Sequence, residues 1–424
     1  MDKINIQISN FRCIKEASID IDGITVLTGL NATGKSTISR LTYYIGYYTN
    51  NYDEIINPKL SNSLIRTKEF LLLSSLSDKT SDTVFPLFSM DESEIISAID
   101  EIINNYEEKK KQVAKIDRER LAQLRGKKIN DRYVFINELK RIKEDIANTF
   151  ERHRFVRKNR PAQYLSDKLN ELFKTKEDSV INRISIQEGG NVILNESRKS
   201  LGLFSSLRNV FYIDTPMIMN LENDNLPNPN ELLHWRQLIK LFNESDSYQS
   251  ESGLSSISND IQEITGGAIY LHETDVQRHH QLLFKDNNNN EYPLMEIASG
   301  IKSFAVLQRL LQKGLLNENT LMIIDEPEAH LHPQWIVEYA RIIHELHRVC
   351  GVRFLIASHS PLMVEALHNL ASNEELSSGK LCYYMAEKAD DNTDRFLHKN
   401  IGVNIDQIFT LFNHSYEMMD HYEG

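Results

Sequence analysis

The residues best suited to do chemistry form a glycine-rich loop. Its spacing is Gly29-x-x-x-x-Gly34-Lys35-Ser36, preceded by the apolar run 24–27 and followed by a helix-forming stretch. Glycines permit backbone geometries in which successive N–H groups converge on an anion, and the N-terminus of the following helix attracts the same anion. The spacing therefore predicts a phosphate-binding loop between a buried strand and a helix.

Each side chain of this loop has an expected role. The ammonium group of Lys35 is suited to neutralise the β- and γ-phosphates of a nucleoside triphosphate, and the hydroxyl of Ser36 is suited to ligate Mg²⁺. A chance glycine turn is the alternative, but a matching acidic motif downstream argues against it. We expect the nucleotide to be held by seven consecutive residues, namely Asn31, Ala32, Thr33, Gly34, Lys35, Ser36 and Thr37.

Two acids follow a second apolar run. Residues 321–324 are all apolar, and Asp325 and Glu326 come directly after them. Burying unpaired charge is costly, so a buried strand that ends in two carboxylates needs compensation, which Mg²⁺ can provide. We expect Asp325 to hold the metal directly or through water, and Glu326 to polarise the attacking water.

Three further motifs are open to more than one interpretation. His359 follows the predicted buried strand 352–357, which is apolar except for Arg353, and is placed to sense a γ-phosphate, with a capping role as the alternative. His330 and His332 could ligate a metal, but no third ligand has a suitable spacing, so structural roles are favoured over a zinc site. Ser299-Gly300, at the start of a predicted helix, is either a common cap or an anion cradle.

Composition limits the class of protein. The chain has 424 residues, 41% of them hydrophobic, and a net charge of −12, which argues against coating nucleic acid with its whole surface. No apolar run is long enough to span a bilayer, and the first residues lack a signal-peptide pattern. The three cysteines are scattered, which suits a reducing compartment. We expect a cytoplasmic protein with no membrane partner.

One segment has the opposite charge balance. Residues 109–160 contain 18 Lys and Arg but only 7 Asp and Glu. Helix-period apolar positions and the near absence of glycine and proline predict a charged helical insertion over residues 91–177. Its surface is either a solvated helical face or a site for DNA, RNA or an acidic partner, and the sequence favours neither.

The rest of the chain predicts an α/β fold. Alternating apolar residues within 3–21 and 182–193 predict antiparallel hairpins beside the buried strands. We expect four parts, listed here in chain order: the N-terminal part of an α/β head with the phosphate loop (1–90), the insertion (91–177), the C-terminal part of the head (178–372) and a C-terminal extension (373–424).

The order of these motifs and the residues within them resemble those of ABC-type ATPase heads. The segments 325–333 (Asp-Glu-Pro-Glu-Ala-His-Leu-His-Pro) and 358–361 (Ser-His-Ser-Pro) are similar to the branch that contains the SMC proteins and the OLD nucleases. The resemblance implies a P-loop head with a mixed sheet and an antiparallel β lobe. It implies ATP and Mg²⁺ as cofactors, Lys35 and Glu326 as catalytic residues with Glu326 as general base, and His359 as the switch histidine.

The resemblance also implies partners. Ser299 and Gly300 would bind the γ-phosphate of ATP held by a second copy, so a homodimer or higher oligomer is expected. Two features depart from the pattern. The metal-binding Gln is not evident, with Asp214 a weak substitute, and no acid follows Gly300.

No Toprim nuclease pattern follows residue 361, unlike in OLD nucleases. The chain thus resembles stand-alone ATPase subunits of anti-phage systems such as PARIS and Septu, which control a separate effector, here a Toprim or HNH nuclease or a toxin. The alternative is a DNA repair or processing ATPase that binds nucleic acid through 109–160.

Overall fold

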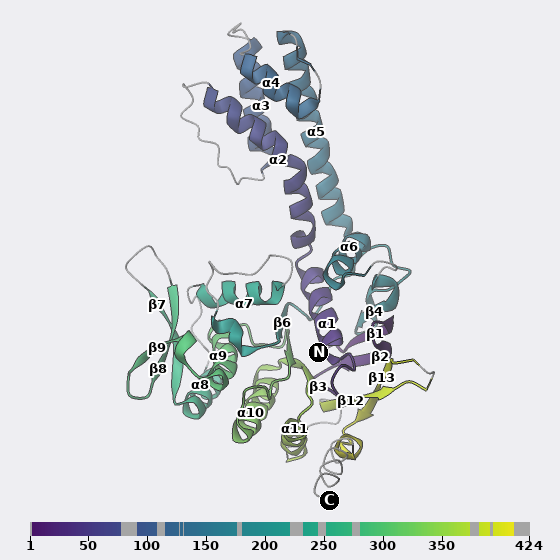
Figure 1. The fold of residues 1–424 in the computed structure, drawn as a ribbon, viewed down its shortest axis with the longest axis vertical. Helices are drawn as coiled ribbons and strands as arrows, with labels where there is room; N and C mark the ends of the chain where they lie inside the picture. The colour runs from purple at the N-terminus through teal and green to yellow at the C-terminus, as the bar shows by residue number, and fades with distance from the viewer. Residues whose placement is uncertain are drawn as a thin grey trace, which may run out of the picture. The chain divides into compact units, whose positions relative to one another are not determined.

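The computed structural model divides into two compact units, residues 1–50 with 165–424 and residues 51–164. The fold is drawn in Figure 1. The structure describes these residues: 2–77, 91–107, 115–126, 128–129, 131–175, 180–220, 232–244, 252–273, 280–373, 381–390 and 393–410. Part of the predicted basic segment, namely residues 109–114, 127 and 130, lies outside them.

The larger unit is built on a ten-stranded mixed sheet, in the order β5-β4-β1-β2-β13-β12-β3-β11-β10-β6. The last five strands of this order run parallel, whereas β5, β4, β1 and β2 form an antiparallel lobe. The predicted α/β class with a mixed sheet and an antiparallel lobe is confirmed. The strands are β1 (Ile4–Phe11), β2 (Ile14–Ile21), β3 (Ile24–Thr28), β4 (Ile184–Glu188), β5 (Asn191–Leu194), β6 (Asn209–Ile213), β10 (Thr320–Asp325), β11 (Arg353–Ala357), β12 (Leu381–Lys388) and β13 (Phe396–Gly402).

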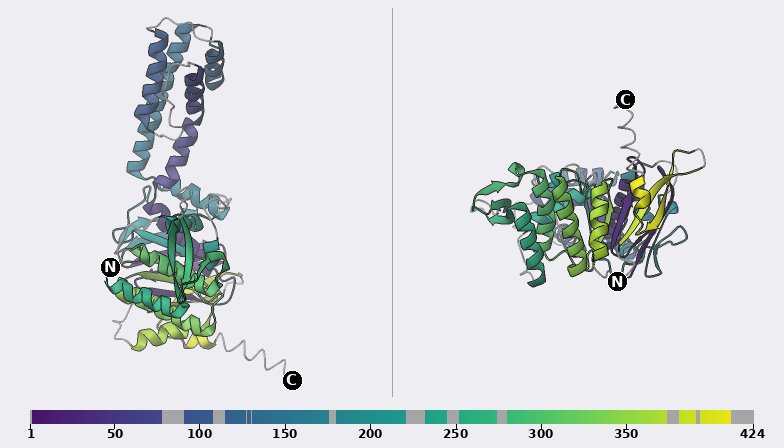
Figure 2. Two further views of the ribbon diagram at one scale, coloured as in Figure 1. Left: turned by 90° about the vertical axis from the view of Figure 1, so that its left-hand side faces the viewer. Right: turned by 90° about the horizontal axis from the view of Figure 1, so that it is seen from below.

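The parallel strands are apolar because helices cover both faces of the sheet. Every residue of β3, β10 and β11 is buried. Alternate residues such as Val26, Ile324 and Phe354 join one core with Ile343 of α10 and Leu367 of α11, and α1 packs against β6, β10 and β11. The views in Figure 2 show these helices beside the sheet. The helices of this unit include α1 (Lys35–Asn50), α7 (Leu233–Asn243), α8 (Ser252–Thr265), α9 (Ser299–Gln312), α10 (Pro333–Cys350) and α11 (Pro361–Asn373).

A second, antiparallel sheet of three strands belongs to the same unit. It consists of β7 (Gly267–Glu273), β8 (His280–Asp286) and β9 (Glu291–Pro293). Ile269 and Phe284 of this sheet pack with Phe304 of α9 in the main core. The apolar side of the small sheet thus packs against α9, the helix that begins at Ser299 and Gly300.

The helical unit covers residues 51–164, whereas the sequence predicted an insertion over 91–177. The difference arises at α2 (Asp53–Ser77), which continues through Pro58, a residue type that is disfavoured in helix interiors. Leu60, Leu64 and Phe70 of α2 are buried in the core of this unit, and that packing outweighs the cost of the proline. Its other helices are α3 (Glu92–Glu107), α4 (Lys115–Arg125) and α5 (Arg132–Asn159), and α6 (Ala162–Phe173) crosses the unit boundary.

The segment 373–424, expected as an extension, supplies part of the central sheet instead. β12 pairs with β3 in parallel, and β13 pairs with β2, so the hairpin lies between the first strands of the chain. Tyr383 and Tyr384 of β12 are buried there. Residues 411–424 lie outside the described part.

Two further observations concern the length of apolar helices and the burial of the tyrosines on α1. In the described ranges, none of the helices combines the length and apolar character needed to cross a bilayer. Three tyrosines of α1, namely Tyr43, Tyr44 and Tyr48, are buried, and the ring centroid of Tyr43 lies 5.8 Å from that of Tyr212 in a tilted arrangement. These rings therefore serve helix packing.

Candidate nucleotide-binding site

The predicted motifs meet because four parallel strands end at one edge of the sheet. Leu27 of β3 pairs with Ala357 of β11, which pairs with Asp325 of β10. β6 lies beside β10 in the same direction, so Asp214 follows at the next position along the edge. Ligands of open α/β sheets bind outside the carboxyl ends of the strands, which is where this edge lies.

The loop after β3 depends on its two glycines. Gly29 and Gly34 have φ angles of 134° and 101°, which side chains disfavour. A Cβ at Gly29 would lie 2.9 Å from the Cβ of Ala386, and one at Gly34 would lie 2.8 Å from Ile14 Cγ1. Ala32 also adopts a positive φ of 63°. The backbone is therefore held in a tight loop whose exposed residues include Asn31, Ala32 and Ser36.

Lys35 lies folded against this loop. Its Nζ donates hydrogen bonds to the carbonyl oxygens of Gly29 and Leu30, both at 2.8 Å, and the residue is only 6% exposed. Burial lowers the pKa of Lys35, while the charges of Glu326 and Asp325 act in the opposite direction. The structure thus places the lysine and both predicted acids within one electrostatic environment.

Asp325 has one satisfied and one unsatisfied carboxylate oxygen. Tyr212 donates its hydroxyl to Oδ2 at 2.9 Å, whereas Oδ1 is buried and has no hydrogen-bond partner among the described residues. Burial raises the pKa of Asp325, and the hydroxyls of Ser39, Tyr212 and Ser36 oppose this effect. A buried oxygen without a partner, close to the Ser36 hydroxyl, fits the oxygen-ligand chemistry of Mg²⁺.

Glu326, Glu328 and His359 form a cluster beside this point. Glu328 is buried, and its Oε1 accepts hydrogen bonds from Ser358 Oγ and from the His359 backbone N–H, both at 2.9 Å. His359 Nδ1 lies 3.2 Å from Glu328 Oε1 and 3.8 Å from Glu326 Oε1. Glu328 therefore fixes the loop that carries His359.

Glu326 is exposed, as His359 is, whereas Glu328 is buried. The side chain of Glu326 is 48% exposed, and its backbone is in the left-handed region with φ of 48°. Its N–H donates to the carbonyl oxygen of Ala357 at 2.7 Å, which ties the turn after β10 to the end of β11. Strained residues of this kind cluster at functional sites. The carboxylate is accessible to water, as a general base must be.

Asp214, the suggested substitute for the metal-binding Gln, is held by two aromatic side chains of α7. Trp235 Nε1 donates to its Oδ1 at 2.7 Å, and His234 Nε2 lies 3.0 Å from its Oδ2. Burial would raise the pKa of Asp214, but the interactions with His234 and Trp235 outweigh it, so the pKa is lowered. Asp214 is therefore a carboxylate held by side-chain contacts. It lies beside Asp325 at the same level of the sheet, because the preceding residues Ile213 and Ile324 pair with each other.

Ser299 and Gly300 are placed differently from the other predicted residues. They begin α9, and a Cβ at Gly300 would lie 3.0 Å from the Trp335 ring and 3.4 Å from the His330 carbonyl oxygen. Neither makes a hydrogen bond to residues 29–36 within the described part of the chain. The structure therefore brings together the predicted residues Lys35, Ser36, Asp325, Glu326 and His359. Ser299 and Gly300, at the start of α9, make no hydrogen bond to this group among the described residues.

His330 and His332, the histidines after the acidic motif, belong to no group of metal ligands among the described residues. His332 caps α10, because its Nδ1 accepts the Gln334 N–H at 3.4 Å. Over the ranges described above, no group of three or more His, Cys, Asp and Glu is arranged to hold a metal. A Mg²⁺ site of one carboxylate and one hydroxyl is consistent with this, because Mg²⁺ commonly keeps several waters and binds substrate phosphates.

Three residues of the site were missed in the sequence. Tyr212 lies inside an apolar strand and gives no local signal, and His398 is far from every motif. Glu328 stood within the quoted acidic motif, and the cost of burying a third acid there could have identified it. All three act by contacting a motif residue, which only the fold makes visible.

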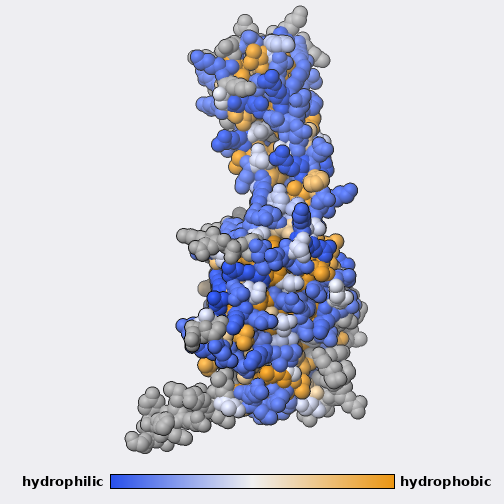
Figure 3. All heavy atoms as spheres, turned by 90° about the vertical axis from the view of Figure 1, so that its right-hand side faces the viewer, coloured by the Kyte–Doolittle hydropathy of each residue, from blue (hydrophilic) through white to orange (hydrophobic). Residues whose placement is uncertain are grey.

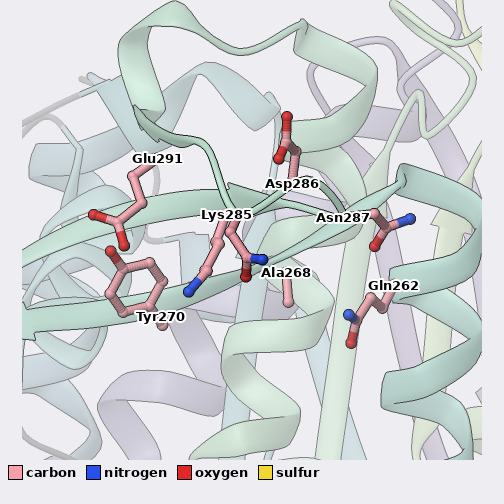
Figure 4. Close-up of a pocket in the computed structure, with 8 residues that line it drawn as sticks. Gln262, Ala268, Tyr270, Lys285, Asp286, Asn287 and Glu291 are labelled. Atoms are coloured by element: carbon pink, nitrogen blue, oxygen red, sulfur yellow. The ribbon is translucent and has the colours of Figure 1, made fainter.

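A pocket elsewhere in the same unit contains none of these residues. Its volume is about 420 Å³, and it lies against the three-stranded sheet and α8. Figure 4 shows the Tyr270 hydroxyl directed toward the Glu291 carboxylate, with Lys285 nearby. Its lining residues are polar or charged except for Ala268, and none of them belongs to the edge where the motifs meet.

Comparisons with known proteins bear on this arrangement. Residues of the chain are 24% identical over 131 positions to protein ea59 of Escherichia phage lambda, a match that covers 31% of this chain and 24% of that protein. The chain therefore spans about a quarter of the length of that relative.

Solved structures that match the chain include the SMC head domain from Thermotoga maritima, with 9% identity and a TM-score of 0.38, covering 95% of this chain and 99% of that one. The ADP conformation of an ATP-binding cassette of an ABC transporter matches with 8% identity and a TM-score of 0.36, covering 97% and 98%. The family model described as AAA ATPase domain matches residues 1–364. Because this match covers most of the chain, the chain belongs to the AAA ATPase domain family.

Proposed function

We propose that this ATPase binds Mg·ATP at the sheet edge formed by β3, β10 and β11 and hydrolyses it there. The observation that carries the proposal is the buried Asp325 Oδ1, which lacks a hydrogen-bond partner in the described structure and lies beside Ser36 at the mouth of the phosphate loop. A protein rarely keeps such an atom without a ligand to satisfy it.

The phosphate loop would position the substrate. Its N–H groups and the N-terminus of α1 bind the phosphate oxygens, and Lys35 exchanges its two carbonyl partners, Gly29 and Leu30, for the β- and γ-phosphates. Ser36 and Asp325 would hold the metal. When bound, Mg²⁺ supplies charge neutralisation for the phosphates.

Glu326 would accept the proton of the attacking water. The water oxygen forms a bond to the γ-phosphorus while the bond from that phosphorus to the bridging oxygen of ADP breaks. The exposed carboxylate of Glu326 is open to such a water, and His359 lies 3.8 Å from it. Glu328 holds the His359 loop by two hydrogen bonds, so it acts as a positioning residue.

A second copy would complete the site. Ser299 and Gly300 make no hydrogen bond to their own phosphate loop in the described structure, so we propose that they reach the γ-phosphate bound to a neighbouring copy. The resemblance to ABC-type heads supports this head-to-tail dimer. The same resemblance, in segments 325–333 and 358–361, supports control of a separate toxin or nuclease in anti-phage defence.

The DNA-processing alternative depends on the basic residues 109–160. The compact unit that contains them, 51–164, has 22 Lys and Arg and 19 Asp and Glu, so its net charge is only +3. Lys143 pairs with Asp100, and Arg157 pairs with Asp53. These acids lie outside 109–160 and neutralise its charge, which favours a solvated helical face over a nucleic-acid surface.

The test is nucleotide binding and turnover by the purified chain with Mg²⁺. We expect ATP binding that Lys35→Ala removes, and slow hydrolysis that Glu326→Gln abolishes while trapping ATP-bound dimers. Absence of adenine-nucleotide binding by the unmodified chain would overturn the proposal. Duplex DNA binding with a steep salt dependence, lost on charge reversal within 109–160, would favour the alternative.

A further inference from the structure

The last hairpin of the chain contacts the phosphate loop at a point that no motif marks. His398, on β13, is buried, and its Nε2 lies 3.0 Å from the carbonyl oxygen of Thr33. β12 and β13 lie beyond residue 364, where the family match ends. A side chain from outside the matched region thus reaches the loop 29–34.

The contact fixes the protonation of the imidazole. A carbonyl oxygen only accepts, so Nε2 carries the proton and donates it to Thr33. Nδ1 is buried and has no hydrogen-bond partner among the described residues, so a second proton there would be unsatisfied. Burial lowers the pKa of His398 to about 4, and the nearby charge of Lys35 acts in the same direction. The ring is therefore a neutral donor at physiological pH.

The acceptor belongs to the peptide that joins Thr33 to Gly34. This peptide is trans, so its C=O and its N–H point in opposite directions. Holding the Thr33 oxygen toward His398 therefore directs the Gly34 N–H away from β13. Gly34 is the residue whose N–H helps to form the anion cradle at the start of α1.

The same hairpin also holds the other end of the loop. Thr28 Oγ1 donates to the carbonyl oxygen of Tyr384 at 3.1 Å, and β12 pairs with β3 up to Thr28. A Cβ on Gly29 would lie 2.9 Å from the Cβ of Ala386, so β12 packs directly against the first glycine. The hairpin therefore contacts the loop at both ends, through Ala386 and through His398.

We propose that His398 is a positioning residue for nucleotide binding, and that its hydrogen bond to Thr33 orients the Thr33–Gly34 peptide so that the Gly34 N–H faces the β-phosphate. The inference rests on the proposed function, since it assumes that the loop binds a nucleoside phosphate. It predicts that the donor on His398 matters for affinity beyond its contribution to packing.

The experiment measures the Kd of a fluorescent ATP analogue and of the matching ADP analogue, with Mg²⁺, for four variants of the full chain. His398→Gln keeps a donor near the position of Nε2, and His398→Leu removes it at similar volume. Tyr383→Phe is the matched control, because it removes a buried hydrogen bond from the same hairpin to Val364, away from the loop. Lys35→Ala tests the loop itself.

We expect His398→Leu to raise both Kd values roughly tenfold, as expected for losing one ordering hydrogen bond. His398→Gln should stay within about twofold of the unmodified chain, and Tyr383→Phe should lower the melting temperature without changing Kd. Equal Kd values for His398→Leu and the unmodified chain, with binding lost in Lys35→Ala, would overturn the inference alone. Equal weakening by Leu and Gln would also overturn it. Failure of the unmodified chain to bind would overturn the proposed function as well.

Discussion

Charge is handled in opposite ways at the sheet edge and in the helical unit. At the sheet edge, Asp325 and Glu328 are buried, and each keeps one carboxylate oxygen without a hydrogen-bond partner in the described structure. In the helical unit, basic side chains of α4 and α5 pair with acids of the same unit, as Arg125 does with Glu138 at 3.0 Å and Lys143 with Asp100 at 2.6 Å. On the face shown in Figure 3 the surface of this unit is mainly hydrophilic.

A high local density of charged residues therefore does not mark the functional site of this chain. The basic stretch 109–160 is the most conspicuous charged segment of the sequence, yet several of its basic residues pair with acids of α2 and α3. The few acids at the sheet edge are far less conspicuous, but burial without full pairing is costly and is typical of a ligand site. Substitutions in the two regions should therefore differ in their effects on turnover.

The largest effect is expected at Glu326. Replacing it with Gln removes the proton acceptor but keeps the size of the side chain and the turn after β10. Loss of a general base typically costs 10²–10⁴-fold, so we expect the ATP turnover number to fall at least roughly a hundredfold with little change in Kd. Single-turnover and binding measurements check this. A variant that keeps more than about a tenth of the activity would contradict the role assigned to Glu326.

His398 should make folding stability depend on pH. The folded-state pKa is about 4, below the roughly 6.5 of an unfolded histidine, so the unfolded chain binds the proton more readily. The charged group that faces the ring is Lys35 of α1. Stability contributed by neutral His398 is therefore present above pH 6.5 and is lost as pH falls toward 4.

Relative to His398→Gln, the free energy of unfolding should fall by about 2 kcal/mol between pH 7.5 and 5. Chemical denaturation of both proteins at several pH values measures this difference, and the other histidines cancel. A difference that stays constant from pH 7.5 to 5 would show that His398 is not held neutral in the folded chain.

Glu328 should affect turnover through His359. Glu328→Ala removes the acceptor for Ser358 Oγ and for the His359 N–H, so the loop after β11 loses its anchor. We expect a turnover number lowered about tenfold and a loss of about 2 kcal/mol in stability. Steady-state kinetics and denaturation measure the two effects.

The control for this variant is Glu345→Ala, since Glu345 pairs only with Arg348 on the exposed side of α10 in the described structure. It should leave turnover unchanged and stability nearly so. If Glu328→Ala lowers stability but leaves turnover as in the control, Glu328 supports the fold and does not position His359.

The smallest effect is expected in the helical unit. Lys143 and Asp100 are 37% and 43% exposed, and exposed pairs typically contribute 0.2–1 kcal/mol. Lys143→Ala should lower the free energy of unfolding by about 0.5 kcal/mol and leave ATP turnover unchanged. Denaturation at low and at high salt tests this, because screening should remove most of the difference. A large loss of turnover would end the contrast between the two regions.

The features that depend on local residue spacing could be predicted from the sequence. The phosphate loop, the acids after β10 and the histidine after β11 each follow an apolar run, and parallel pairing of those runs brings them to one edge. The boundaries of the helical unit were missed because burial of Leu60 and Leu64 overrides the local effect of Pro58.

The roles of Tyr212 and His398 were missed for a different reason. Their partners, Asp325 and Thr33, are more than 100 residues away along the chain, so no local pattern can reveal them. The pairing of β12 with β3, which brings His398 to the loop, is likewise a long-range contact.

The most direct test of the account is the position of a divalent ion in crystals grown with Mn²⁺ and a non-hydrolysable ATP analogue. The anomalous signal of Mn²⁺ locates the metal without assumptions about the chain. The account predicts a single strong peak bonded to Ser36 Oγ, in contact with Asp325 Oδ1 directly or through one water, and beside the β- and γ-phosphates. A nucleotide bound with its metal away from both Ser36 and Asp325 would contradict it.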